Sequence, residues 1–128
     1  LYYEGLINVV KKGRTGAEEI QNMMRNFREN PPKEIAGSLV EEVKDFNEQT
    51  CFVVSKNEKK VMDDIPKSNV LIYYTQDGTK VCVRPSGTEP KIKFYVSVKD
   101  SISSEQDFVE KLPKLEEKIQ NVKKDLNL

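Results

Sequence analysis

Apolar and polar side chains alternate most regularly between residues 92 and 99. The apolar positions Ile92, Phe94, Val96 and Val98 are interleaved with the polar or exposed-type positions Lys93, Tyr95, Ser97 and Lys99. A period of two residues is that of a β-strand. The pattern therefore predicts a strand with one face on a core and the other face in solvent.

Three further β-type runs come earlier in the chain. Residues 70–75 and 79–84 are apolar runs joined by Asp77-Gly78, which is a strong signal for a β-hairpin. Residues 6–10, LINVV, are rich in branched side chains and predict a strand that ends at Lys11-Lys12-Gly13. These runs predict a sheet built largely from hairpins.

The middle of the chain is less regular. Residues 38–46 predict a strand, but they do not alternate cleanly, and residues 52–55 either extend it or form a short edge strand. Residues 57–64 are polar and charged, which predicts an exposed loop. Asp63 and Asp64 suggest a metal site, but a solvated turn is favoured because hard cations need several converging oxygens.

Two segments have a helical period. Thr15 and Glu18 match a capping box, and the apolar residues that follow share one helical face until Pro31 and Pro32 end the helix. A second helix is predicted to be capped by Ser103 with Gln106 and carries one apolar stripe: Phe108, Leu112, Leu115, Ile119, Val122 and Leu126. Pro113 lies inside it and predicts a kink or a split first turn.

The order of elements is strand, helix, three or four strands, helix. Two helices that cover one face of a mostly antiparallel sheet make an α+β fold. The stripe on the last helix is short and the sheet needs a cover, which favours packing on the sheet over a coiled coil. We therefore expect one domain over residues 1–128.

Composition narrows the classes of function. The 21 basic and 21 acidic residues balance, whereas a general nucleic-acid binder would show a basic excess. There is no histidine, which excludes His-based triads and HExxH zinc sites. Cys51 and Cys82 fit neither a disulfide framework nor a metal motif, and no segment reads as a signal peptide or a membrane span, so the cytoplasm is expected.

Residues 84–95, RPSGTEPKIKFY, hold the chemistry of an anion site. Arg84 ends one strand and Lys93 opens the next, with Ser86, Gly87 and Thr88 between them. Arginine grips phosphate through two parallel hydrogen bonds, lysine adds a point charge, and glycine lets the main chain approach a ligand or reach unusual conformations. A hairpin turn with incidental charges is the alternative. Ser86 is disfavoured as a nucleophile because no histidine exists to activate it.

The same loop is where the chain resembles a known family. RPSGTEP followed by a basic residue is similar to the phosphate-binding loop in the last domain of the α-D-phosphohexomutases, the phosphoglucomutases and phosphomannomutases. The segments GAEEIQNMMRNFRENPP and SNVLIYYTQDGTKVCV and the terminal helix also resemble that domain. Many members carry arginine where this chain has Lys93, so a positive charge is kept there without the bidentate fork.

The resemblance implies a TATA-binding-protein-like arrangement and a C-terminal domain of a longer isomerase, with residues 1–12 as a remnant of the junction with the preceding domain. Such an enzyme moves a phosphoryl group between the 1- and 6-positions of glucose or mannose phosphate. The catalytic phosphoserine, the Mg²⁺ ligands and the sugar-reading loop would lie in the preceding domains. The isolated chain is therefore predicted to be inactive and to hold neither catalytic residues nor metal ligands.

The share of this domain would be to clamp the phosphate that is not reacting, through Arg84, Ser86, Gly87, Thr88 and Lys93. Its partners would be a hexose phosphate and the preceding domains of the same enzyme, with no nucleic acid and no membrane. The alternative is a stand-alone anion- or nucleic-acid-binding α+β module. Neutral charge and the lack of an aromatic stacking platform disfavour nucleic acid.

Overall fold

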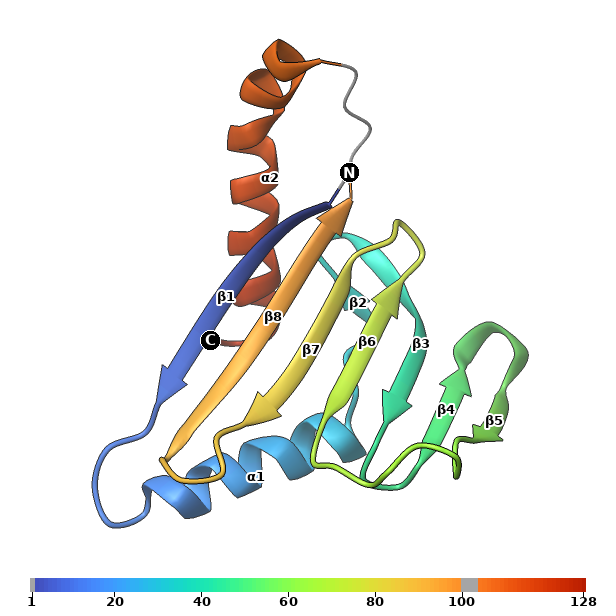
Figure 1. Ribbon diagram of the computed structural model, residues 1–128, viewed down its shortest axis with the longest axis vertical. Helices are drawn as coiled ribbons and strands as arrows, with labels where there is room; N and C mark the ends of the chain where they lie inside the picture. Colours follow the sequence, from blue (N-terminus) through green and yellow to red (C-terminus); the bar gives the residue numbers. More distant parts are fainter. Residues whose placement is uncertain (1, 100–103) are drawn as a thin grey trace.

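The computed structural model describes residues 2–99 and 104–128, which form a β-sheet with helices packed against it (Figure 1). In chain order the elements are β1 (Tyr2–Val10), α1 (Gly16–Glu29), β2 (Glu34–Ile35), β3 (Ser38–Asp45), β4 (Thr50–Val53), a 3₁₀ turn (Val54–Lys56), β5 (Glu58–Val61), β6 (Leu71–Thr75), β7 (Lys80–Pro85), β8 (Lys91–Lys99) and α2 (Glu105–Asp125). Neither α1 nor α2, the helices of the described ranges, has the length and apolar character needed to cross a membrane.

All the strand pairs in the described residues are antiparallel. The strands follow the order β1-β8-β7-β6-β3-β4-β5, and β2 pairs separately with β3. β1 pairs with β8 along its whole length, from Tyr2 opposite Lys99 to Val10 opposite Lys91. The predicted α+β class with a mostly antiparallel sheet is therefore confirmed.

One face of the sheet is the core. The alternating apolar residues of β8 are at most 1% exposed, and α1 packs Phe27 edge-on against Phe94, with ring centroids 5.6 Å apart. The buried Tyr73 hydroxyl also donates to the Phe27 carbonyl (2.6 Å), which ties α1 to β6. Complete burial of such side chains contributes about 1.5–3 kcal/mol each. The same core cluster includes the stripe of α2, with Leu115, Ile119, Val122 and Leu126, so both helices lie on this face.

The helix ends differ from the predictions in detail. Thr15 precedes α1, but its hydroxyl does not cap the helix and instead donates to Glu19 Oε1 (3.4 Å), so the predicted capping box is wrong. α1 ends at Glu29, before the two prolines, as predicted. α2 is capped by Ser104, whose Oγ accepts from the Asp107 amide (3.1 Å), whereas the predicted cap Ser103 lies outside the described residues. α2 runs continuously through Pro113, so the proline does not split it.

The far edge of the sheet explains the weak pattern in the middle of the sequence. A β-bulge in β3 between Val40 and Glu42 shifts the register against β6, which breaks the alternation of the strand. β5 forms where a loop was predicted, and all four of its residues are exposed. Pairing with β4 supplies its backbone hydrogen bonds, and no periodic pattern within the strand indicates that pairing.

Candidate functional site

Arg84 and Lys93 are direct cross-strand partners in the β7–β8 hairpin. Their inward neighbours Val83 and Phe94 are fully buried, so both cations project from the face of the sheet opposite the helices, which we call the open face. Directly opposed side chains have their Cβ atoms about 4.5–5.5 Å apart, and two like charges in such a pair repel each other. Asn8 of β1 lies on the other side of Lys93.

No internal anion relieves this repulsion. Within residues 2–99 and 104–128 neither Arg84 nor Lys93 forms an ion pair or a side-chain hydrogen bond. The Arg84 side chain is exposed and Lys93 is half-buried. The site therefore presents two positive charges side by side with their hydrogen-bonding groups unused.

Ser86 shapes the loop that joins the two strands. Its Oγ accepts from the amides of Thr88 and Glu89, both at 3.4 Å, and its own amide donates to the Lys91 carbonyl (2.8 Å). This local turn of a serine hydroxyl onto amides two and three residues ahead is a recurring way to close a loop. Ser86 thus organises the loop, and its hydroxyl proton stays available to donate.

Gly87 lies at the exposed tip of this loop. Its φ is not in the left-handed region, and a Cβ added there would meet no atom within 4 Å. Gly87 therefore does not use the left-handed conformation that glycine permits. Within the described residues neither backbone strain nor crowding requires a glycine here, and the missing side chain leaves the main chain at the tip accessible.

A second basic loop lies beside this one, and sequence reasoning missed it. Residues 11–15, which we call the β1–α1 loop, follow β1, and the Lys11 amide donates to the Pro90 carbonyl (2.9 Å). Figure 1 shows the two loops at the same end of the sheet, next to the start of α1. More than 70 residues separate them in the sequence. The sequence signal for this loop was its three cations, Lys11, Lys12 and Arg14. Only the pairing of β1 with β8 shows that they lie beside the β7–β8 loop.

A comparison with known families identifies the family of this chain. Residues 10–115 match the family model described as "Phosphoglucomutase/phosphomannomutase, C-terminal domain". The chain belongs to that family. The matched range contains Arg84, Lys93 and the loop between them, and it begins at the last residue of β1.

Curated relatives support the assignment over a shorter range. The chain is 41% identical over 88 residues to a phosphoglucomutase of Staphylococcus aureus strain MRSA252, which covers 69% of this chain and 16% of that relative. It is 40% identical over 87 residues to the phosphoglucomutase of strain MSSA476, covering 68% of this chain and 15% of that relative. The chain thus matches only about a sixth of the length of these relatives.

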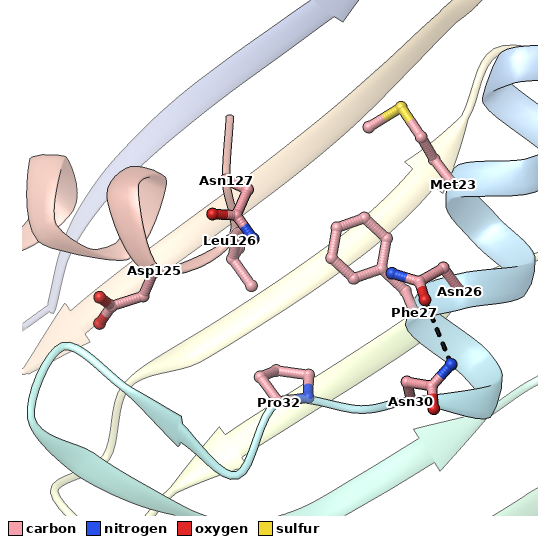
Figure 2. A pocket seen from close by; sticks show the side chains of 8 residues that line it. All are labelled: Met23, Asn26, Phe27, Asn30, Pro32, Asp125, Leu126 and Asn127. Carbon is pink, nitrogen blue, oxygen red and sulfur yellow. Dashed lines mark hydrogen bonds between the residues drawn. The ribbon is translucent and has the colours of Figure 1, made fainter.

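Two hollows in the described part of this family member lie away from Arg84 and Lys93. One hollow of about 340 Å³ lies between α1 and the end of α2 and is lined in part by the apolar Phe27 and Leu126 (Figure 2). At its rim the side-chain amide of Asn30 donates to Asn26 Oδ1 (3.2 Å). A larger one of about 800 Å³ lies by β3 and β4, with Leu39, Phe52 and other apolar residues in its wall. Neither contains Arg84, Lys93 or the loop between them. The candidate site is an open corner of the sheet. It is therefore recognised by its charged and hydroxyl side chains and not by a pocket.

The two thiols show no sign of activation. Burial and the hydrogen bond from Cys51 Sγ to Glu42 Oε1 (2.9 Å) raise the pKa of Cys51 to about 11. Partial burial also raises the pKa of Cys82, although Lys80 and Arg84 act in the opposite direction. Cys82 lies on the open face opposite Tyr95, not in the core, and it stays protonated at neutral pH.

Proposed function

We propose that this chain is the C-terminal domain of a phosphohexomutase and that it clamps the phosphate of a hexose phosphate that is not reacting. The observation that carries the proposal is the direct opposition of Arg84 and Lys93, neither of which forms an ion pair among residues 2–99 and 104–128. A pair of like charges costs stability unless a ligand neutralises it, and a phosphate dianion has the charge to do so. Membership of the phosphoglucomutase/phosphomannomutase family supports the same ligand.

The roles of the residues follow from their placement. Arg84 would donate two parallel hydrogen bonds to phosphate oxygens, and Lys93 would add a point charge beside it. The Ser86 and Thr88 hydroxyls and the main chain at Gly87 would supply further donors. Holding one end of the sugar in this way would orient the other end toward the reacting group, because phosphoryl transfer depends mostly on positioning and charge stabilisation.

The proposal assigns the chemical step and Mg²⁺ to the preceding domains of the longer enzyme. The described residues contain no group of three or more His, Cys, Asp or Glu side chains placed to hold a metal ion. Asp63 and Asp64 are exposed in the β5–β6 connection. Glucose and mannose phosphates are both candidate substrates.

An NMR titration of the chain with glucose 6-phosphate tests the clamp. The loop should bind weakly when alone, with a dissociation constant of about 1 mM. The largest shifts should fall on Gly87 and Thr88, and they should disappear in Arg84→Ala. Arg25→Ala, which removes an exposed arginine from the outer side of α1, is the matched control and should bind as well as the unmodified chain. Shifts centred on α2, or shifts that survive Arg84→Ala unchanged, would contradict the proposal.

A further inference from the structure

The β1–α1 loop and the β7–β8 loop are in direct contact. Besides the hydrogen bond between Lys11 and Pro90, the two loops meet where α1 begins at Gly16, a buried glycine. A Cβ added to Gly16 would lie 3.0 Å from Pro90 Cβ and 2.5 Å from the Lys11 carbonyl oxygen. No side chain fits there without a backbone shift, so the absence of one lets the β1–α1 loop sit directly against the loop that carries Ser86 and Gly87.

The β1–α1 loop brings unpaired positive charge to this corner. Lys12 and Arg14 are exposed, and within the described ranges neither forms an ion pair or a side-chain hydrogen bond. Gly13, between them, has a φ of +94° and turns the chain sharply. Such a turn in a short link between a strand and a helix keeps both cations close to the end of β1 and hence to Pro90.

The charges of the corner do not balance, although those of the whole chain do. The two loops and their flanking residues hold six cations: Lys11, Lys12, Arg14, Arg84, Lys91 and Lys93. The carboxylates there are Glu18, Glu19 and Glu89. Glu18 and Glu19 lie in the first turn of α1, where the helix dipole already favours a negative charge, and Glu19 accepts the Thr15 hydroxyl. A positive corner on a neutral chain attracts anions selectively to that place.

We infer that the β1–α1 loop is a second wall of the same anion site, and that Lys12 and Arg14 add to the attraction for the phosphate dianion held by Arg84 and Lys93. This inference rests on the proposed function. It extends the site from one contiguous motif to two loops that are more than 70 residues apart in the chain. The ligand group is the phosphate monoester itself, so the contribution of these two cations should not depend on the sugar.

The test is a charge-removal variant with a matched control. Lys12→Gln/Arg14→Gln removes two positive charges from the β1–α1 loop. Lys59→Gln/Lys60→Gln removes two from β5, which lies at the opposite edge of the sheet from β1. Both variants and the unmodified chain are titrated with glucose 6-phosphate and with inorganic phosphate, at low salt and in about 0.5 M salt, where exposed charges are largely screened. The dispersion of the amide spectrum verifies that each variant is folded.

At low salt each removed cation should weaken binding about three- to fivefold, because a unit charge about 8 Å from a dianion in water contributes on the order of 1 kcal/mol. The Lys12→Gln/Arg14→Gln chain should therefore bind both ligands about tenfold more weakly than the Lys59→Gln/Lys60→Gln chain, and high salt should shrink the gap. Equal affinity of the two variants would overturn the inference, as would a loss confined to glucose 6-phosphate. If Arg84→Ala abolishes binding while Lys12→Gln/Arg14→Gln does not weaken it, only this inference fails. If neither substitution matters, the proposed function fails as well.

Discussion

Two consecutive hairpin connections differ in whether their charged side chains have partners within the domain. The β6–β7 turn places Asp77 among donors: the hydroxyls of Thr75 (2.6 Å) and Thr79 (2.8 Å), the Thr79 amide (3.1 Å) and the Lys118 ammonium of α2 all reach its carboxylate. The β7–β8 loop, at the other end of β7, places Arg84 opposite Lys93 and offers neither of them an anion within the described chain.

This difference is the one expected between a structural turn and the binding loop that we propose. The Asp77 carboxylate of the β6–β7 turn is bound by donors of the same domain, and its ion pair with Lys118 also holds α2 against the sheet. Arg84 and Lys93 at the β7–β8 loop would be neutralised only by an anion from outside the described chain. A charge that is satisfied internally stabilises the fold, whereas opposed like charges destabilise it until a ligand binds. Four predictions test that contrast, in order of decreasing effect.

Removing the carboxylate at the β6–β7 turn should produce the largest change. Asp77→Ala should lower the free energy of unfolding by about 2–3 kcal/mol, because it deletes several hydrogen bonds to a charged group, of which the exposed part is discounted for solvent screening. Urea unfolding followed by circular dichroism measures this, with Asp64→Ala as a control for losing an exposed aspartate. Phosphate binding should be unchanged. A loss no greater than that of the control would contradict the structural role of the turn.

Arg84→Lys should weaken phosphate binding without changing the free energy of unfolding. The charge is kept but the planar fork is lost, so affinity for glucose 6-phosphate should fall about tenfold, or about 1.4 kcal/mol. The measurement is the NMR titration, with Arg25→Lys as the matched control. Unchanged affinity would show that Arg84 acts only as a point charge. A large drop in the unfolding free energy would show that the β7–β8 loop is structural after all.

Acid should weaken the β6–β7 turn selectively. Its hydrogen bonds and Lys118 outweigh partial desolvation and hold the pKa of Asp77 well below the ordinary value of 3.8. A carboxylate with a lowered pKa in the folded state stabilises above its unfolded pKa, and this stabilisation is lost as pH falls through the folded pKa. Between pH 6 and pH 3 the loss should be about 1 kcal/mol, with the exposed part discounted. In Asp77→Asn this part of the pH dependence should be missing. Parallel pH profiles for the two proteins would refute the assignment.

Giving the β7–β8 loop an internal counter-charge should make it resemble the β6–β7 turn. Lys93→Glu places a carboxylate directly opposite Arg84, so the free energy of unfolding should rise by about 0.5 kcal/mol while phosphate binding is lost. Lys99→Glu, at the far end of the same face of β8, is the control and should raise stability less. Denaturant unfolding and the phosphate titration are run on both variants. Destabilisation by Lys93→Glu would mean that the opposed cations are not strained in the unliganded domain.

Local patterns in the sequence determined much of this domain. The alternation in β8, the Asp-Gly connection of the β6–β7 hairpin and the stripe on α2 were all predicted, and the structure confirms them. Each is a direct consequence of burying one face of an element, which leaves a period that can be read within a few residues. The RPSGTEP loop could be singled out for a related reason, because its cations, hydroxyls and glycine lie close together in the chain.

Other features were decided by particular contacts, some between neighbouring residues and some between distant segments. The capping role expected of Thr15 was lost to a contact with Glu19, and β5 became a strand through its pairing with β4. Lys118 reaches Asp77 across 41 residues, and the β1–α1 loop reaches Pro90 because β1 pairs with β8, a strand that is distant in the sequence. Such contacts depend on which strands become neighbours and on the loop-closure cost of bringing them together. Neither leaves a period in the local sequence, so the RPSGTEP loop could be singled out from the sequence, whereas its contact with the β1–α1 loop was decided by the fold.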